Sequence, residues 1–133
     1  MISLISPTSI IIPRKKAKDR KVQLNLNVFR NLHYQVNNQT KVAYRDDMRQ
    51  QLEGLVLDAP IQVIFKLYKK GKRILDKNNV YSIVAKFFYD ALVHYGCVPD
   101  DSDDYIGFET YAPTVYGADS DYCEIEIYEN EGE

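Results

Sequence analysis

Apolar and polar positions alternate in several short segments of the chain, a pattern that predicts β-strands. Residues 9–13 are a β-branched run, and residues 22–29 alternate as a half-buried strand or extended segment does. A longer alternation covers residues 61–68, and two further strand candidates cover residues 105–111 and 122–128. The pattern therefore predicts five strands.

Two other segments have helical periodicity. The first covers about residues 41–55, with Asn37 or Asn38 as its candidate N-cap. Its apolar residues share one face, namely Tyr44, Met48, Leu52 and Leu55. The second covers about residues 80–95, where apolar side chains recur at helical spacing for four turns.

Asn78 or Asn79 is the candidate N-cap of the second helix, and Gly96 suits the position after its end. The elements follow the order β-β-α-β-α-β-β without an internal repeat. This order predicts an α+β fold, a small mixed β-sheet with two α-helices packed on it. We expect a single domain over residues 1–133, with flexible ends at residues 1–8 and 129–133.

Composition excludes several classes of protein. Apolar residues make up 45% and charged residues 27% of the chain, which excludes a disordered or collagen-like protein. Cys97 and Cys123 are too few for a disulfide framework, so we expect buried thiols in a reducing compartment. The apolar start lacks a basic leading segment, and no apolar run is long enough to cross a bilayer. We therefore expect a soluble cytoplasmic protein without a signal peptide.

Charge is divided unequally along the chain, although the formal net charge is only −2. Residues 1–75 carry 15 Lys and Arg against 5 Asp and Glu, whereas residues 76–133 carry 2 against 14. This division predicts a polyanionic partner for the first part, and either a metal ion or self-shielding for the second.

Two basic clusters, at residues 14–21 and 66–73, account for most of the positive charge. Both are interpreted as exposed turns or loops. Solvation explains them without a ligand, and a nuclear-localisation signal is a further interpretation of the first. If the partner is a nucleic acid, the candidate phosphate-binding residues are Arg14, Lys15, Lys16, Lys66, Lys69, Lys70, Lys72 and Arg73.

The second predicted helix has a polar face opposite its apolar stripe. Asn79, Ser82, Lys86 and Asp90 lie on it within about 80° of one another, at about 100° per residue. The face is either a solvated surface or part of a site. An ion pair between Lys86 and Asp90 has the less favourable order along a helix.

Acidic residues flank this helix on both sides. Asp76 precedes it and the loop 100–104 follows it, and carboxylates are the oxygen ligands that Mg²⁺ prefers. A solvated turn explains the loop without a metal. A helix of about 16 residues is roughly 24 Å long. Asp76 and Asp101 therefore converge only if a loop folds back along the helix or a second protomer completes the site.

Other chemistry has little support in the sequence. His33 and His94 are isolated, and we interpret both as structural residues. The motifs of α/β-hydrolases, nucleotide-binding loops, dinucleotide-binding folds and zinc proteases are missing, so no organic cofactor is expected.

The second helix and its surroundings resemble the RusA family of small dimeric Holliday junction resolvases of phages and prophages. The family motif D-x-D-N corresponds to residues 76–79, and K-x-x-x-D-A-L corresponds to residues 86–92. The following glycine and acidic pair correspond to Gly96 and to Asp100 with Asp101.

Residues 24–34 resemble the N-terminal segment of the Gram-positive phage branch, and the resemblance covers about residues 9–128. It implies a Mg²⁺-dependent homodimer that nicks four-way DNA junctions symmetrically in phage DNA recombination and repair, inside the bacterial host cell.

The resemblance also implies a role for each motif residue. Asp76, Asn78 and Asp101 would be metal ligands. Lys86 would lie near the scissile phosphate, and Asp90 would pair with it or orient it. The motif also includes Asn79 and Asp100.

One position departs from the family motif, because its second aspartate is Asn78 in this chain. An amide oxygen coordinates Mg²⁺ but brings no charge, so metal affinity and activation of water should be weaker. Two functions therefore stay open. One is a resolvase, slow or dependent on Mn²⁺. The other is a RusA-fold protein that has lost cleavage and binds DNA, or a protein partner, in phage regulation.

Overall fold

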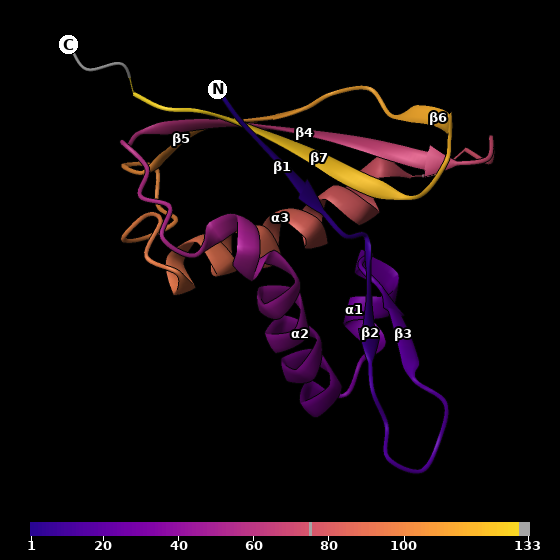
Figure 1. The fold of residues 1–133 in the computed structure, drawn as a ribbon. Coiled ribbons are helices and arrows are strands. Elements are labelled where there is room, and N and C mark those ends of the chain that lie inside the picture. Colours follow the sequence, from indigo (N-terminus) through magenta and orange to yellow (C-terminus); the bar gives the residue numbers. More distant parts are fainter. Residues whose placement is uncertain (75, 131–133) are drawn as a thin grey trace.

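The computed structural model describes residues 1–74 and 76–130 (Figure 1). Within these residues the chain forms an α+β fold, as predicted. Its elements are β1 (Ile2–Ser6), β2 (Ser9–Ile12), β3 (Arg20–Gln23), α1 (Leu26–Asn31), α2 (Tyr34–Leu52), β4 (Ile61–Lys70), α3 (Lys77–His94), β5 (Ile106–Tyr111), β6 (Val115–Ala118) and β7 (Tyr122–Tyr128).

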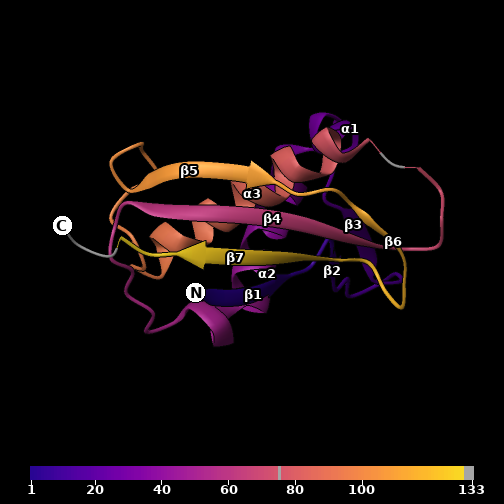
Figure 2. The same cartoon turned by 90° about the horizontal axis from the view of Figure 1, so that it is seen from above.

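A mixed sheet is built around β4, its longest strand. The strand order is β1-β7-β4-β5, and β6 pairs with the last residues of β4, beyond the end of β5. β7 is antiparallel to both β1 and β4, whereas β5 and β6 run parallel to β4. The helices lie behind the sheet in Figure 2, so they cover one of its faces and leave the other open.

The alternation along β4 decides which face is covered. Its buried side chains are those predicted, namely Ile61, Val63, Phe65 and Leu67. The ring centroid of Phe65 lies between 5.7 and 6.4 Å from those of four other rings, Tyr81, Phe88, Tyr89 and Tyr111. Because three of these rings come from α3, this cluster fixes the helix against the sheet.

α3 buries its apolar stripe as predicted, but it begins earlier than its periodicity indicated. The predicted N-caps, Asn78 and Asn79, are wrong. Asp76 is the N-cap, and its Oδ1 accepts a hydrogen bond from the backbone N–H of Asn78 at 3.2 Å. Gly96 follows the helix with φ of 72°, a left-handed conformation that glycine adopts without strain.

α2 also begins before its predicted start. Its N-cap is His33, whose Nδ1 accepts from a backbone N–H of the first turn at 3.2 Å, rather than Asn37 or Asn38. The first two turns are mostly polar and show no apolar period, so the sequence pattern did not predict them. Leu55 lies beyond the end of α2, while the other predicted apolar residues are buried on it, namely Tyr44, Met48 and Leu52.

Residues 22–29 do not form one extended segment. Only residues 22 and 23 belong to β3, and α1 follows. The side chain of Asn25 caps α1 by accepting from the backbone N–H of Val28 at 2.9 Å. Asparagine at an N-cap favours a helix over a strand, and here it outweighs the alternation of apolar residues.

Two ends of the chain were expected to be flexible, and the structure describes residues 1–8 and 129–130 of them. Residues 2–6 form β1, paired with β7, so the expectation of a flexible segment there is wrong. At the other end, Glu129 Oε2 accepts from the backbone N–H of Asp58 at 2.9 Å, and Asn130 also contacts this segment. Residues 131–133 lie outside the described residues.

Within the described residues, β2 pairs with β3 and neither joins the larger sheet, and their hairpin projects away from that sheet (Figure 1). Cys97 and Cys123 are buried free thiols, as predicted. Burial raises the pKa of Cys123 to about 12, which keeps it a neutral thiol at physiological pH.

Candidate functional site

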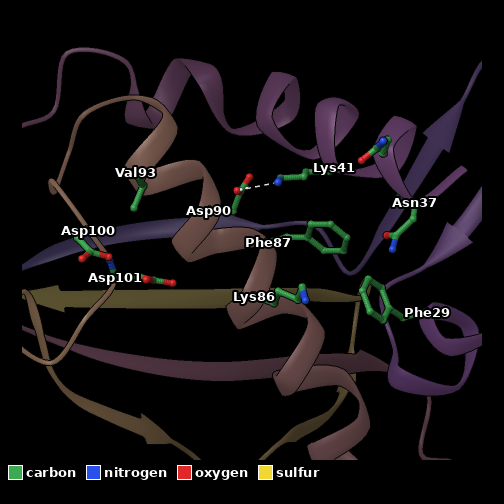
Figure 3. Close-up of a pocket in the computed structure, with 10 residues that line it drawn as sticks. Phe29, Asn37, Lys41, Lys86, Phe87, Asp90, Val93, Asp100 and Asp101 are labelled. Atoms are coloured by element: carbon green, nitrogen blue, oxygen red, sulfur yellow. Dashed lines mark hydrogen bonds and ion pairs between the residues drawn. The ribbon is translucent and has the colours of Figure 1, made fainter. Parts of the chain in front are cut away.

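An open pocket of 520 Å³ lies along the polar face of α3, between this helix, α1, α2 and the loop after α3 (Figure 3). Its charged lining residues are Lys41, Lys86, Asp90, Asp100 and Asp101. The other side chains that line it are Phe29, Asn37, Asn38, Phe87 and Val93. The pocket therefore brings the motif lysine and the motif acidic pair into one space.

The loop after α3 folds back along the helix because of the way the helix ends. The backbone N–H groups of Gly96 and Cys97 donate to carbonyls of the last turn at 3.0 and 2.9 Å, the pattern of a Schellman cap. The side chains of Cys97 and Val98 are buried, which anchors the reversed chain. Asp100 and Asp101 follow directly and reach the pocket; Asp101 points toward α3 in Figure 3.

Asp76 and Asn78 lie at the other end of α3 and do not line the pocket. Both are exposed, and Asn79 is in the same turn. In the part of the chain that the structure describes, no three Asp, Glu, His or Cys side chains are placed to hold a metal ion. Asp100 and Asp101 have the carboxylate chemistry that Mg²⁺ prefers. However, the predicted ligand set of Asp76, Asn78 and Asp101 is not assembled within one chain.

Asp90 is held by α2 rather than by Lys86. Its carboxylate oxygens lie 3.1 Å from Lys41 Nζ and 3.0 Å from Arg45 Nε. Partial burial acts to raise the pKa of Asp90, but the hydrogen bonds and charges of Arg45 and Lys41 outweigh it and lower the pKa. The expected pairing of Asp90 with Lys86 is wrong, because α2 crosses α3 here and presents two cations.

Lys86 has no ion pair among the described residues. Its Nζ lies 5.0 Å from the centroid of the Phe29 ring, a cation–π contact at an exposed site. Such a contact is weak, so the ammonium group is free to meet an anion in the pocket.

The predicted phosphate-binding cations fall into two separate groups. The hairpin group, Arg14, Lys15 and Lys16, lies on the exposed loop of the projecting β2–β3 hairpin (Figure 1). The β4 group lies in the second half of β4 and in the turn after it, and consists of Lys66, Lys69, Lys70, Lys72 and Arg73.

Among the described residues, the side chains of two members of the β4 group have partners. Lys69 Nζ lies 3.5 Å from Asp121 Oδ2, and Lys66 Nζ lies 5.6 Å from the centroid of the Tyr68 ring. Both contacts are on the surface and contribute little to stability. The positive charge of this group is therefore only partly neutralised by the described residues.

Several pocket residues were not predicted as part of a site. Asn37 and Lys41 line the pocket, and Arg45 holds Asp90 beside it. The three residues are four positions apart on α2, so they share a face of that helix. This spacing was a usable signal, but the asparagines were interpreted as helix caps. Phe29 was assigned to an extended segment, which gave it no place beside α3.

Comparison with known proteins finds no family model that matches the chain and no curated protein that is significantly similar to it. Among the described residues, no helix is long and apolar enough to span a membrane.

Replacing Asp90 with Asn is expected to lower the free energy of unfolding by about 1–2 kcal/mol at neutral pH, because Lys41 and Arg45 lose their charged partner. The fold lowers the pKa of Asp90. Its ionised form therefore contributes stability above the usual Asp pKa of about 3.9, and this contribution disappears as pH falls through the lowered value. Urea unfolding of both proteins at several pH values measures the difference.

The control for this prediction is Asp103→Asn, which removes an exposed carboxylate outside the pocket. Its effect should stay within about 0.5 kcal/mol. A loss for Asp90→Asn that is the same at neutral pH and in strong acid would contradict the role of the ion pairs.

Proposed function

We propose that this protein is a structure-specific DNA endonuclease that resolves four-way junctions with the help of a divalent cation. The observation that carries the proposal is the shared pocket of Lys86 with Asp100 and Asp101. A cation beside carboxylates suits a site that holds a phosphodiester and a hard metal ion together. The resemblance of residues 76–101 to the RusA family supports the same chemistry.

Each group has a distinct role in this proposal. Lys86 binds the scissile phosphate, since no carboxylate neutralises it among the described residues. Asp100 and Asp101 provide oxygen ligands for Mg²⁺ or Mn²⁺. Asp76 and Asn78 lie too far along α3 to join them in one chain, and for this reason the proposal includes a homodimer in which a second copy completes the ligand set.

The two basic groups bind the DNA arms outside the pocket. The hairpin group projects from the body of the molecule, whereas the β4 group ends close to the start of α3. DNA backbone contacts of this kind provide affinity without sequence preference. The proposed setting is phage DNA recombination and repair in the bacterial cytoplasm.

A fluorescently labelled mobile four-way junction, incubated with the protein and Mg²⁺ or Mn²⁺, tests the proposal. The wild-type chain should nick opposing strands, and Asp101→Asn should nick at least about ten-fold more slowly, because a metal ligand is lost. Denaturing gels measure the product, and gel shifts confirm that the variant still binds. Asp103→Asn is the matched control, since it changes a carboxylate of the same loop outside the pocket.

Equal nicking by Asp101→Asn and wild type would contradict the assignment of the site. Junction binding without product in either cation would contradict the endonuclease itself. It would instead establish the second candidate, a junction-binding protein that does not cleave.

The position of Asp76 favours this second candidate. Its carboxylate caps α3, and Asn78 brings no charge to the same turn. A chain that has lost its metal site while keeping both basic groups would still bind branched DNA and compete with enzymes that cleave it.

A further inference from the structure

We propose that the pocket along α3 also binds one unstacked nucleotide, with its base against Phe29 and its phosphate at Lys86. This inference rests on the proposed function, because branched DNA is the source of the nucleotide. It assigns a binding role to the end of the pocket that lies opposite Asp100 and Asp101.

The two ends of the pocket differ in chemistry (Figure 3). Asp100 and Asp101 lie at one end, and Phe29 lies with Asn37 at the other. Lys86 extends between them. An anionic phosphate is repelled by the carboxylates and attracted by the ammonium group, so it settles at the lysine. The attached nucleoside then has the uncharged end of the pocket available to it.

Phe29 can provide the stacking surface. Its ring and that of Phe87 form a T-shaped pair, with centroids 6.2 Å apart and an angle of 77° between the planes. Phe87 therefore covers at most one face of the Phe29 ring, and Lys86 Nζ lies over a face of this ring at 5.0 Å from the centroid. When the ammonium group moves to a phosphate, this space is open to a base, and aromatic faces are the usual stacking partners of unpaired bases.

Asn37 and Asn38 provide the polar contacts that a base requires. Neither amide side chain forms a hydrogen bond with the residues that the structure describes, and Asn37 points from α2 toward Phe29 in Figure 3. Each amide offers a donor and an acceptor, which matches the edge of a nucleobase and pairs especially well with adenine.

The size of the pocket and the nature of branched DNA agree with this ligand. Its 520 Å³ lies within the range of small-molecule sites. Extrusion of a base from a regular duplex costs stacking and pairing energy, and the cost is least where the base is already unpaired. The base pairs that flank the branch point of an open four-way junction lack a stacking neighbour on one side, so extrusion costs less there than in a regular duplex. The pocket therefore recognises the branch point by binding a nucleotide that has left the base stack there.

Titration with 2′-deoxyadenosine 5′-monophosphate and, separately, with inorganic phosphate tests the inference, with NMR signals of the protein as the readout. Both ligands should shift Lys86 and, because the ammonium group leaves the ring, the Phe29 signals. Only the nucleotide should also shift the Asn37 side-chain amide signals, whereas phosphate should leave them unchanged. Phe29→Leu keeps an apolar side chain against Phe87 and should weaken nucleotide binding by about ten-fold or more. Phosphate affinity should not change in this variant.

Asn37→Ala gives a second variant that does not alter the core, and it should also weaken nucleotide binding selectively. Gln39→Ala, on the same helix but outside the pocket, is the matched control and should have no effect. If the nucleotide binds wild type and Phe29→Leu equally, or shifts only the signals that phosphate shifts, the inference is overturned.

The test separates this inference from the proposed function. A gel shift with the four-way junction is run on the same samples. Junction binding with Phe29-independent nucleotide binding overturns the inference alone. Failure to bind the junction overturns the proposed function, and the nucleotide titration then still decides whether the pocket takes a nucleotide.

Discussion

The affinity of the protein for a four-way junction is expected to fall by about three to five orders of magnitude between about 50 and 200 mM salt. This range corresponds to about 6–10 phosphates neutralised by Lys and Arg, each of which releases condensed counterions from the DNA. The two basic groups provide eight candidate cations per chain. Fluorescence anisotropy over a salt series measures the slope, and a flat response would contradict DNA as the partner.

Because the two basic groups lie apart, the contribution of each to DNA binding can be measured with its own double variant. Lys15→Ala with Lys16→Ala removes two cations of the hairpin group, and Lys72→Ala with Arg73→Ala removes two of the β4 group. Each double variant should reduce the slope of log affinity against log salt by about two. Arg49→Ala is the matched control, because Arg49 is already paired with Glu53 at 2.6 Å on α2. An unchanged slope in one double variant would remove that group from the interface.

Replacing Phe65 with Ala is expected to lower the free energy of unfolding by about 3–5 kcal/mol. Phe65 is fully buried on β4, and its ring packs against four others from α3 and β5. Truncation removes apolar contact area and leaves a cavity that the surrounding rings cannot fill without leaving their rotamers. Chemical denaturation followed by circular dichroism measures the change.

The control for this variant is Ile64→Ala, one residue away on the same strand. Ile64 is half-buried and faces the open side of the sheet, so its loss should cost about 1 kcal/mol. Similar losses for the two variants would mean that the covered face of the sheet is not the main core of the protein.

The sequence was most informative where one periodic signal dominates. β4 and α3 bury the side chains that their apolar positions predict, because no competing local interaction opposes the pattern. Boundaries were less predictable. The N-caps are Asp76 and His33, while four asparagines nearby looked equally suitable, since capping depends on the path of the preceding chain.

Three short elements, α1, β6 and β1, were not predicted. α1 begins after Asn25 within an alternating segment, where the capping hydrogen bond decides the conformation. β6 has four residues and includes Gly117, so it has no pattern of its own and exists because the end of β4 offers an unpaired edge. β1 was not predicted, because residues 1–8 were expected to be a flexible end, yet all five of its residues pair with β7.

Only some residues of the candidate site were predictable, and its contacts were less so. Lys86, Asp100 and Asp101 were chosen from motif spacing, and the cap at Gly96 brings the loop back to the helix. The partner of Asp90 was not predictable, because it depends on how α2 crosses α3, a property of tertiary packing with no trace in the spacing along α3.

The pairing of β4 with β7 has a consequence for synthesis on the ribosome. Residues 62–68 of β4 pair with residues 122–128 of β7, and β1 also pairs with β7. During translation the apolar centre of the sheet therefore leaves the exit tunnel well before the strand that joins it to β1. In this interval the nascent chain exposes two unpaired strand edges, which are the surfaces that chaperones shield and that otherwise associate between chains.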